Sequence, residues 1–331
     1  MKKIFKLLCL GFLTISVVAC SSNKSIEIPD SVLDFDLTKM STEDQEKHDN
    51  LVEVFKSLNN ESTLAFGTTT TANIFNQLGL NVAAAPESVS LDKDLTEKQV
   101  AITEYEKGDG NVVNLGSALT LNLEAIVKMN PDYFVYSDAM MSTATNYSTL
   151  EENGIKLVAL PQSNYQDMFI VIDAMKAAGI SNEKLDEKVT EFSTDLEKIS
   201  TIVKDKEAKS VALIQVAGGQ NMSIGNDAML GKVAKSLGIK NIFETSATSA
   251  LNSEKLLSEN PDLIFHYTHS MQMGTTTTGF EDTIQGKKFQ TLDAVKNKKV
   301  VAMGNDSYAF SPSVDLNITK MMLQLVENAY E

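Results

Sequence analysis

The residues best suited to chemistry gather in one short stretch, "FHYTHSMQMG", which holds His266, His269, Met271 and Met273. Imidazole and thioether groups are ligands that haem iron and copper accept. Side chains alternate along a strand, so an odd separation puts His266 and His269 on opposite faces if the strand extends that far. We therefore expect one of the two histidines, and not both, to meet a planar ligand in a cleft.

Catalytic signatures are missing from the sequence. It contains neither G-x-S-x-G nor H-E-x-x-H, and its three histidines leave few general bases. Two neighbouring histidines also fall short of the four ligands of a structural zinc site. The sequence therefore predicts a binding protein rather than an enzyme, with a bare metal ion left as an alternative ligand.

The histidine stretch ends a phrase that occurs twice. "NLEAIVKMNPDYFVYSD" carries Glu124 and Asn130, and "NSEKLLSENPDLIFHYTH" carries Glu254 and Asn260 at the same offsets. Each copy is typical of a short helix, an Asn-Pro break and a buried parallel strand, because proline ends the helix and favours an extended residue before it. A duplicated α/β unit predicts two similar lobes. The two glutamates would then stand at equivalent points that could steer toward a basic partner, although ordinary solvated helix glutamates would look the same.

A strand, a turn and a helix closed by "LG" also recur. They occur in "STLAFGTTTTANIFNQLGL" and again in "SVALIQVAGG", followed by a helix from about Asp227 to Gly238. In the first copy the turn places Thr68 and Thr69 at a helix N-terminus, where backbone N–H groups and hydroxyls form an anion site. Simple helix capping is the alternative. Alternating strands and helices predict parallel sheets.

One long helix is predicted between the two halves. From Asn182 to Asp205 apolar residues recur every three or four positions as one stripe, over about 36 Å. The predicted fold class is α/β, with two Rossmann-like lobes of parallel sheets joined by a long rigid helix and a ligand cleft between the lobes. The expected segments are 61–180 for the N-lobe, 181–206 for the lobe-spanning helix and 207–331 for the C-lobe.

The first residues are expected to form a targeting signal. A cationic start, an apolar stretch and "VVAC" are typical of a bacterial lipoprotein signal peptide over residues 1–19, with a lipid on Cys20, whereas an ordinary secretory signal is the alternative. Residues 20–60 would hold the lipid anchor, a tether and a helix over 41–58 that Ser41 caps.

The charge of the chain excludes one class of partner. Removal of the signal peptide takes three of the 29 lysines, and the 26 that remain against 44 acidic residues give a formal charge of −18. This balance argues against nucleic acid and suits a soluble body held away from an anionic membrane surface. The chain also has no Arg and no Trp, so it offers neither a bidentate carboxylate fork nor an indole platform.

Taken in order, these motifs resemble a known family. A lipoprotein signal, "LGSALTLNLEAIVKMNPDYFVYSD", the long helix, "SEKLLSENPDLIFHYTH" and "LDAVKNKKVVAMGND" follow one another. The series resembles the helical-backbone class of substrate-binding proteins of ABC importers, which carry iron-siderophores, cobalamin, haem and related chelates. The resemblance covers about residues 63–330 and implies a ligand clasped between two lobes with little hinge motion. It also implies an ABC permease and its ATPase as partners, a monomer, and a lipid-anchored location on the extracellular face of a Gram-positive-like cell membrane.

The resemblance also implies roles for individual residues. Glu124 and Glu254 match the acidic positions that dock on the permease. His269 matches the C-lobe axial ligand of the haem-binding members from Gram-positive bacteria. Apart from the resemblance, Tyr308 is expected along the C-lobe wall of the cleft, and Met271, beside the histidines, is expected to bind the ligand.

The same resemblance has a gap in the N-lobe. Haem-binding members place a Met where this chain has Leu119, and leucine cannot bind iron. Met140 or Met141 could replace it, unless these residues only pack in the core. Catecholate siderophores carry a high negative charge, so the absence of Arg counts against them as the ligand. The two propionates of haem could instead bind at Thr68 and Thr69. The sequence thus predicts capture of an iron chelate, above all haem; a ferric siderophore, cobalamin or a metal ion is the alternative ligand, and a lipoprotein adhesin the alternative function.

Overall fold

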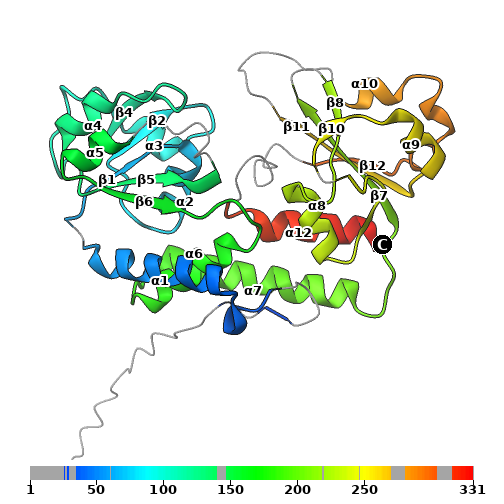
Figure 1. Ribbon diagram of the computed structural model, residues 1–331, viewed down its shortest axis with the longest axis horizontal. Coiled ribbons are helices and arrows are strands. Elements are labelled where there is room, and N and C mark those ends of the chain that lie inside the picture. Colours follow the sequence, from blue (N-terminus) through cyan, green and yellow to red (C-terminus); the bar gives the residue numbers. More distant parts are fainter. Residues whose placement is uncertain are drawn as a thin grey trace, which may run out of the picture.

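The structure is a computed structural model that describes residues 26, 28–29, 35–59, 61–139, 147–217, 220–245, 247–269, 280–303 and 315–330. Two α/β lobes stand side by side above a layer of helices (Figure 1). The long member of this layer is α7 (Glu183–Val203), and α1 (Thr42–Ser57) and α6 (Asp167–Ala177) lie with it beneath the N-lobe. The predicted α/β class with two lobes is confirmed. No helix in the described part of the chain is long and apolar enough to cross a membrane.

The N-lobe is built on a sheet in which all neighbouring strands are parallel, in the order β3-β4-β2-β1-β5-β6. Its strands are β1 (Leu64–Phe66), β2 (Ala84–Glu87), β3 (Gln99–Val100), β4 (Val112–Ser117), β5 (Tyr133–Ser137) and β6 (Lys156–Leu160). Apolar residues of two helices pack on one face of this sheet: α4 (Leu123–Met129) and α5 (Ser148–Glu152). The other face is covered by α6 together with α2 (Thr69–Gln77) and α3 (Lys93–Glu97).

The C-lobe sheet has the order β10-β8-β7-β11-β12, with β9 beside the start of β7. Its strands are β7 (Ser210–Ala217), β8 (Gln220–Ser223), β9 (Lys240–Asn241), β10 (Ser249–Ala250), β11 (Leu263–His269) and β12 (Val300–Ala302). Strands β7, β9, β11 and β12 are parallel as expected, but β8 and β10 add an antiparallel edge. Only two residues separate β7 from β8, and a connection that short can join only antiparallel strands.

Helices cover both faces of the C-lobe sheet as well. One face packs on α7 together with α8 (Met229–Ser236) and α12 (Ile318–Ala329). The other face packs on α9 (Ser253–Glu259), α10 (Phe280–Ile284) and α11 (Asp293–Lys296). Two short 3-10 helices complete the described elements: η1 (Leu37–Lys39) and η3 (Phe289–Thr291).

The repeated Asn-Pro break ends a helix in the same way in both lobes. Asn130 closes α4 and Asn260 closes α9, each in the left-handed conformation, with φ of 49° and 44°. The expectation of an extended asparagine is wrong. Asparagine tolerates the left-handed region because its short polar side chain can bond locally, and that conformation stops a helix in a single residue.

Helix α7 joins the lobes through a shared apolar core. Its buried stripe runs from Leu185 to Ile199, and it belongs to one cluster that contains buried residues of both lobes. Asn182 caps the helix at the Leu185 N–H and donates to the Leu78 carbonyl of the N-lobe at 3.0 Å. Farther along α7, Asp195 accepts a hydrogen bond from Thr319 of α12 at 3.0 Å. The floor beneath the two lobes is therefore continuous and well packed.

Candidate functional site

The carboxyl ends of β4, β2 and β1 meet at one edge of the N-lobe sheet, because these strands are parallel neighbours. Ligands of open α/β sheets bind at this edge. The loops that follow these strands span residues 118–122, 88–92 and 67–68, respectively. They form the described rim of the candidate site, which we call the N-lobe rim.

Two bare aliphatic side chains stand on the N-lobe rim. Val89 is 73% exposed and Leu119 is 75% exposed, and they are the strongly exposed large apolar side chains of the described residues. Glu87 and Ser117 are paired across β2 and β4, and each aliphatic residue lies two positions beyond its member of that pair. The two side chains therefore belong to neighbouring loops at the same level of the sheet. Leu119 is also the residue that stands where the resemblance implied a Met.

Hydroxyl groups continue the rim toward β1. The Thr69 hydroxyl lies 3.2 Å from that of Ser90, which lies 2.9 Å from that of Ser88. Thr68 caps α2, since its hydroxyl oxygen accepts the Thr71 N–H at 3.1 Å. Thr68 therefore has the capping role that the sequence left open, and the half-buried Thr69 has its hydroxyl engaged with Ser90.

The N-lobe rim carries no cation. Its three loops contain no Lys, and their one acidic residue, Asp92, accepts hydrogen bonds from Asn76 and Gln77. Within the described residues, no group of three or more His, Cys, Asp and Glu side chains could hold a metal ion. The rim therefore offers apolar contact and neutral hydrogen bonds.

A buried carboxyl group lies below the ends of β5 and β6. The side chain of Asp167 on α6 is fully buried and accepts the Asn164 N–H at 2.7 Å, while Lys47 of α1 lies 3.9 Å away. Burial raises the pKa of Asp167 to about 7, although the Asn164 N–H and the Lys47 charge act to lower it. This group links α1 to the loop that follows β6.

An interior strand of the C-lobe sheet, β11, carries the two histidines. Strand β11 lies between β7 and β12, and its backbone runs to His269, which is paired with Ala217 of β7. His266 is 3% exposed and packs against Phe280 of α10 with ring centroids 5.5 Å apart, so it belongs to the core on that face. The side chain of His269 lies outside the described part of the structure. The other predicted site residues outside it are Cys20, Met140, Met141, Met271 and Tyr308.

Glu124 and Glu254 occupy equivalent places in the two lobes. Each is the second residue of its helix, α4 or α9, and each is exposed. Asn122 and Asn252 cap these helices by accepting an N–H three residues on, at 2.9 Å in both cases. Within the described part of the chain neither glutamate makes a hydrogen bond or an ion pair. Figure 1 shows α4 and α9 in separate lobes, so the two carboxylates are presented independently.

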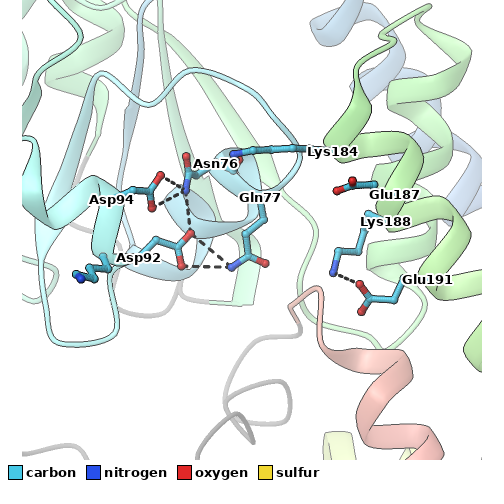
Figure 2. Close-up of a pocket in the computed structure, with 9 residues that line it drawn as sticks. Asn76, Gln77, Asp92, Asp94, Lys184, Glu187, Lys188 and Glu191 are labelled. Carbon is cyan, nitrogen blue, oxygen red and sulfur yellow. Dashed lines mark hydrogen bonds and ion pairs between the residues drawn. The ribbon is translucent and has the colours of Figure 1, made fainter.

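An open groove of about 450 Å³ separates α2 and α3 from α7. Figure 2 shows that several of its polar groups are already partnered: Asn76 donates to Asp92 and Asp94, and Lys188 bonds to Glu191 at 2.8 Å. Lys184 of α7 donates to the backbone carbonyl of Asn76. The groove is therefore polar, and the hydrogen bond of Lys184 connects α7 to the N-lobe across it.

Sequence reasoning missed Val89. It occurs in "ESVSL", directly after β2, and nothing in that string distinguishes it from an ordinary loop residue. The one available signal is a lone aliphatic residue between two serines at the carboxyl end of a parallel strand.

Two α/β lobes on one continuous floor, with a cation-free rim at the carboxyl edge of a sheet, are an architecture suited to binding a solute between the lobes. The profile of the periplasmic binding protein family matches residues 64–307, and the chain belongs to that family. The match begins with β1 and continues past β12, so it includes both lobes.

Individual relatives match the sequence of this chain at low identity. The uncharacterized ABC transporter substrate-binding lipoprotein YvrC of Bacillus subtilis is 24% identical over 225 residues, which cover 64% of this chain and 68% of YvrC. The high-affinity heme uptake system protein IsdE of Staphylococcus aureus is 21% identical over 254 residues, which cover 73% of this chain and 82% of IsdE.

Solved structures show the same fold. The crystal structure of S. aureus IsdE complexed with heme has a TM-score of 0.60 at 18% identity and covers 82% of this chain and 100% of that one. The siderophore-binding protein BauB, bound to two acinetobactin molecules and ferric iron, has a TM-score of 0.61 at 14% identity and covers 82% and 93%.

Proposed function

We propose that this protein captures haem outside the cell and delivers it to the permease of an ABC importer. The observation that carries the proposal is the position of His269 at the carboxyl end of β11, an interior parallel strand of the C-lobe sheet. Ligands of α/β folds bind at that end of a strand. The haem uptake protein IsdE among the relatives supports the same ligand.

In this proposal His269 is an axial ligand of the haem iron. A neutral imidazole binds iron through one nitrogen while a carbonyl or carboxylate orients the other. Met140 or Met141, which follow β5, supplies a second axial ligand. Met271 and Tyr308 line the C-lobe side of the bound haem.

The propionates of haem are proposed to meet the start of α2. Thr69 offers a hydroxyl there, and the helix N-terminus offers backbone N–H groups next to the capping residue Thr68. This arrangement needs no arginine, which the chain lacks.

Delivery is proposed to depend on Glu124 and Glu254. A two-fold permease needs two contact points to fix the orientation of its binding protein, and these exposed carboxylates occur once in each lobe. The lipid on Cys20 is proposed to keep the monomeric protein beside that permease on the outer face of the membrane.

The proposal is tested by replacing one histidine at a time. His269→Ala should shift the Soret band of the haem complex and speed haem loss. His266→Gln is the matched control, because His266 packs in the core and glutamine keeps a polar side chain there. A larger spectral change in His266→Gln than in His269→Ala would contradict the assignment, provided that both variants keep the melting temperature of the wild type.

A ferric siderophore is the second candidate ligand, because BauB holds one on the same fold. An absorbance scan separates the two ligands, since a siderophore complex has no Soret band.

A further inference from the structure

Val89 and Leu119 are unusual for exposed loop residues. Leaving a large aliphatic side chain in water costs free energy that burial would recover, and here two such side chains lie in adjacent loops. Neither loop carries a cation that could attract a carboxylate or phosphate to this place. The pair is therefore suited to contact with an uncharged, apolar surface of a ligand.

We propose that Val89 and Leu119 form an apolar seat for the ring of a porphyrin, and that this seat contributes burial and no metal ligand. The inference rests on the proposed function and makes it more specific. Part of the affinity for haem would come from contact with the porphyrin ring and would not depend on the iron. The ring edge with methyl and vinyl groups lies on the seat, and the carboxylates point away from it toward β1.

The order of the loops supports this orientation. Strands β4, β2 and β1 are consecutive in the sheet, so Leu119, Val89 and Thr69 follow one another along the rim. The chemistry changes in the same direction, from two aliphatic side chains to the linked hydroxyls of Ser90 and Thr69. An amphipathic planar ligand can satisfy both parts in one orientation.

The test compares haemin with metal-free protoporphyrin IX. Val89→Asn combined with Leu119→Asn should weaken both ligands by the same factor, at least about tenfold, measured by absorbance for haemin and by fluorescence for the metal-free ring. Both side chains are about three-quarters exposed, so the double variant should keep the wild-type melting temperature. Glu61→Asn is the matched control, since it places the same amide on an exposed residue at the opposite, amino edge of the N-lobe sheet and should change neither affinity.

The outcomes separate this inference from the proposed function. Unchanged affinity for both ligands in the double variant overturns the seat and leaves haem capture standing, as does a loss confined to haemin. Lost uptake by cells at unchanged affinity also overturns it, because the pair would then contact the permease. Absence of binding by either porphyrin to the wild type would overturn the seat and the proposed ligand together.

Discussion

Asp132 accepts two hydrogen bonds from Thr63, one from the backbone N–H and one from the hydroxyl, each at 2.8 Å. Asp262 accepts the same pair of bonds from Ser210 at 2.9 and 2.7 Å. Each aspartate comes just before one strand of its lobe and holds the residue that leads into the neighbouring strand. The repeated phrase thus joins two parallel strands in each lobe at their amino ends.

Replacing Asp132 should lower the free energy of unfolding of the N-lobe by a measurable amount. Asp132→Ala leaves the Thr63 N–H without its carboxylate partner, which should cost roughly 1–3 kcal/mol, measured by urea unfolding. Asp262→Ala should have a similar effect on the C-lobe. Glu104→Ala removes an exposed carboxylate of the N-lobe and serves as the control. Equal stability of Asp132→Ala and this control would refute the structural role of the motif.

The hydrogen bonds to Asp132 make the stability of the N-lobe depend on pH with a known sign. The Thr63 N–H is the main cause that holds the pKa of Asp132 below its usual range. The stabilising contribution is therefore present above the unfolded pKa, near 3.9, and is lost as the pH falls through the lower folded value.

The contribution of Asp167 to stability should depend on pH in the opposite direction. Burial raises its pKa to about 7, so the folded protein holds a proton that the unfolded chain has lost between about pH 4 and 7. Stability from this group is present at pH 4 and declines as the pH rises through 7, by at most about 1.4 kcal/mol per pH unit. Asp167→Asn should therefore raise the melting temperature at pH 8 more than at pH 5.

Lys47 provides an independent check on Asp167. Its charge lowers the Asp167 pKa, so Lys47→Met should move the pH-dependent decline in stability to higher pH. A melting temperature that responds to pH identically in the wild type and in Asp167→Asn would show that this carboxyl group does not titrate near neutrality.

Glu124 and Glu254 should matter for transport and not for ligand binding. Changing both to Ala should abolish haem-dependent uptake by cells and leave the affinity of the purified protein unchanged, because both carboxylates lie on exposed helix starts. Glu259→Ala, an exposed change on the same α9 helix, should preserve uptake. A tenfold loss of affinity in the double variant, about 1.4 kcal/mol, would place these residues at the ligand instead.

Membrane attachment is expected to depend on Cys20. Without its thiol there is no atom to carry the lipid, so Cys20→Ala should release the protein into the medium or block signal removal. Fractionation followed by immunoblotting measures this directly. Retention of the processed variant in a fraction that only detergent dissolves would argue for another anchor.

Local signals in the sequence predict much of this fold. Ser41 caps α1 as the sequence predicts, because its side chain accepts a nearby N–H. The apolar stripe of α7 is buried because its spacing matches the helical repeat. These features depend on residues within one or two turns of each other, so the sequence alone is sufficient to find them.

Features that depend on distant neighbours were beyond reach. The alternation of side chains along β11 cannot tell which face packs on α10, and the burial of His266 against Phe280 is decided by that packing. Likewise, Val89 and Leu119 lie in neighbouring loops because β2 pairs with β4, although the two residues are 30 positions apart in the sequence. The left-handed Asn130 and Asn260 show that a rule about residues before proline excludes one conformation without choosing between the rest.

The most direct test of the account is a titration of residues 21–331 with haemin, followed by visible absorbance. Haem capture predicts a Soret band that saturates near one equivalent and that resists removal by a large excess of apomyoglobin for longer than in His269→Ala. A protein that shows no Soret band with excess haemin, and that binds a ferric siderophore in calorimetry, would contradict haem as the ligand.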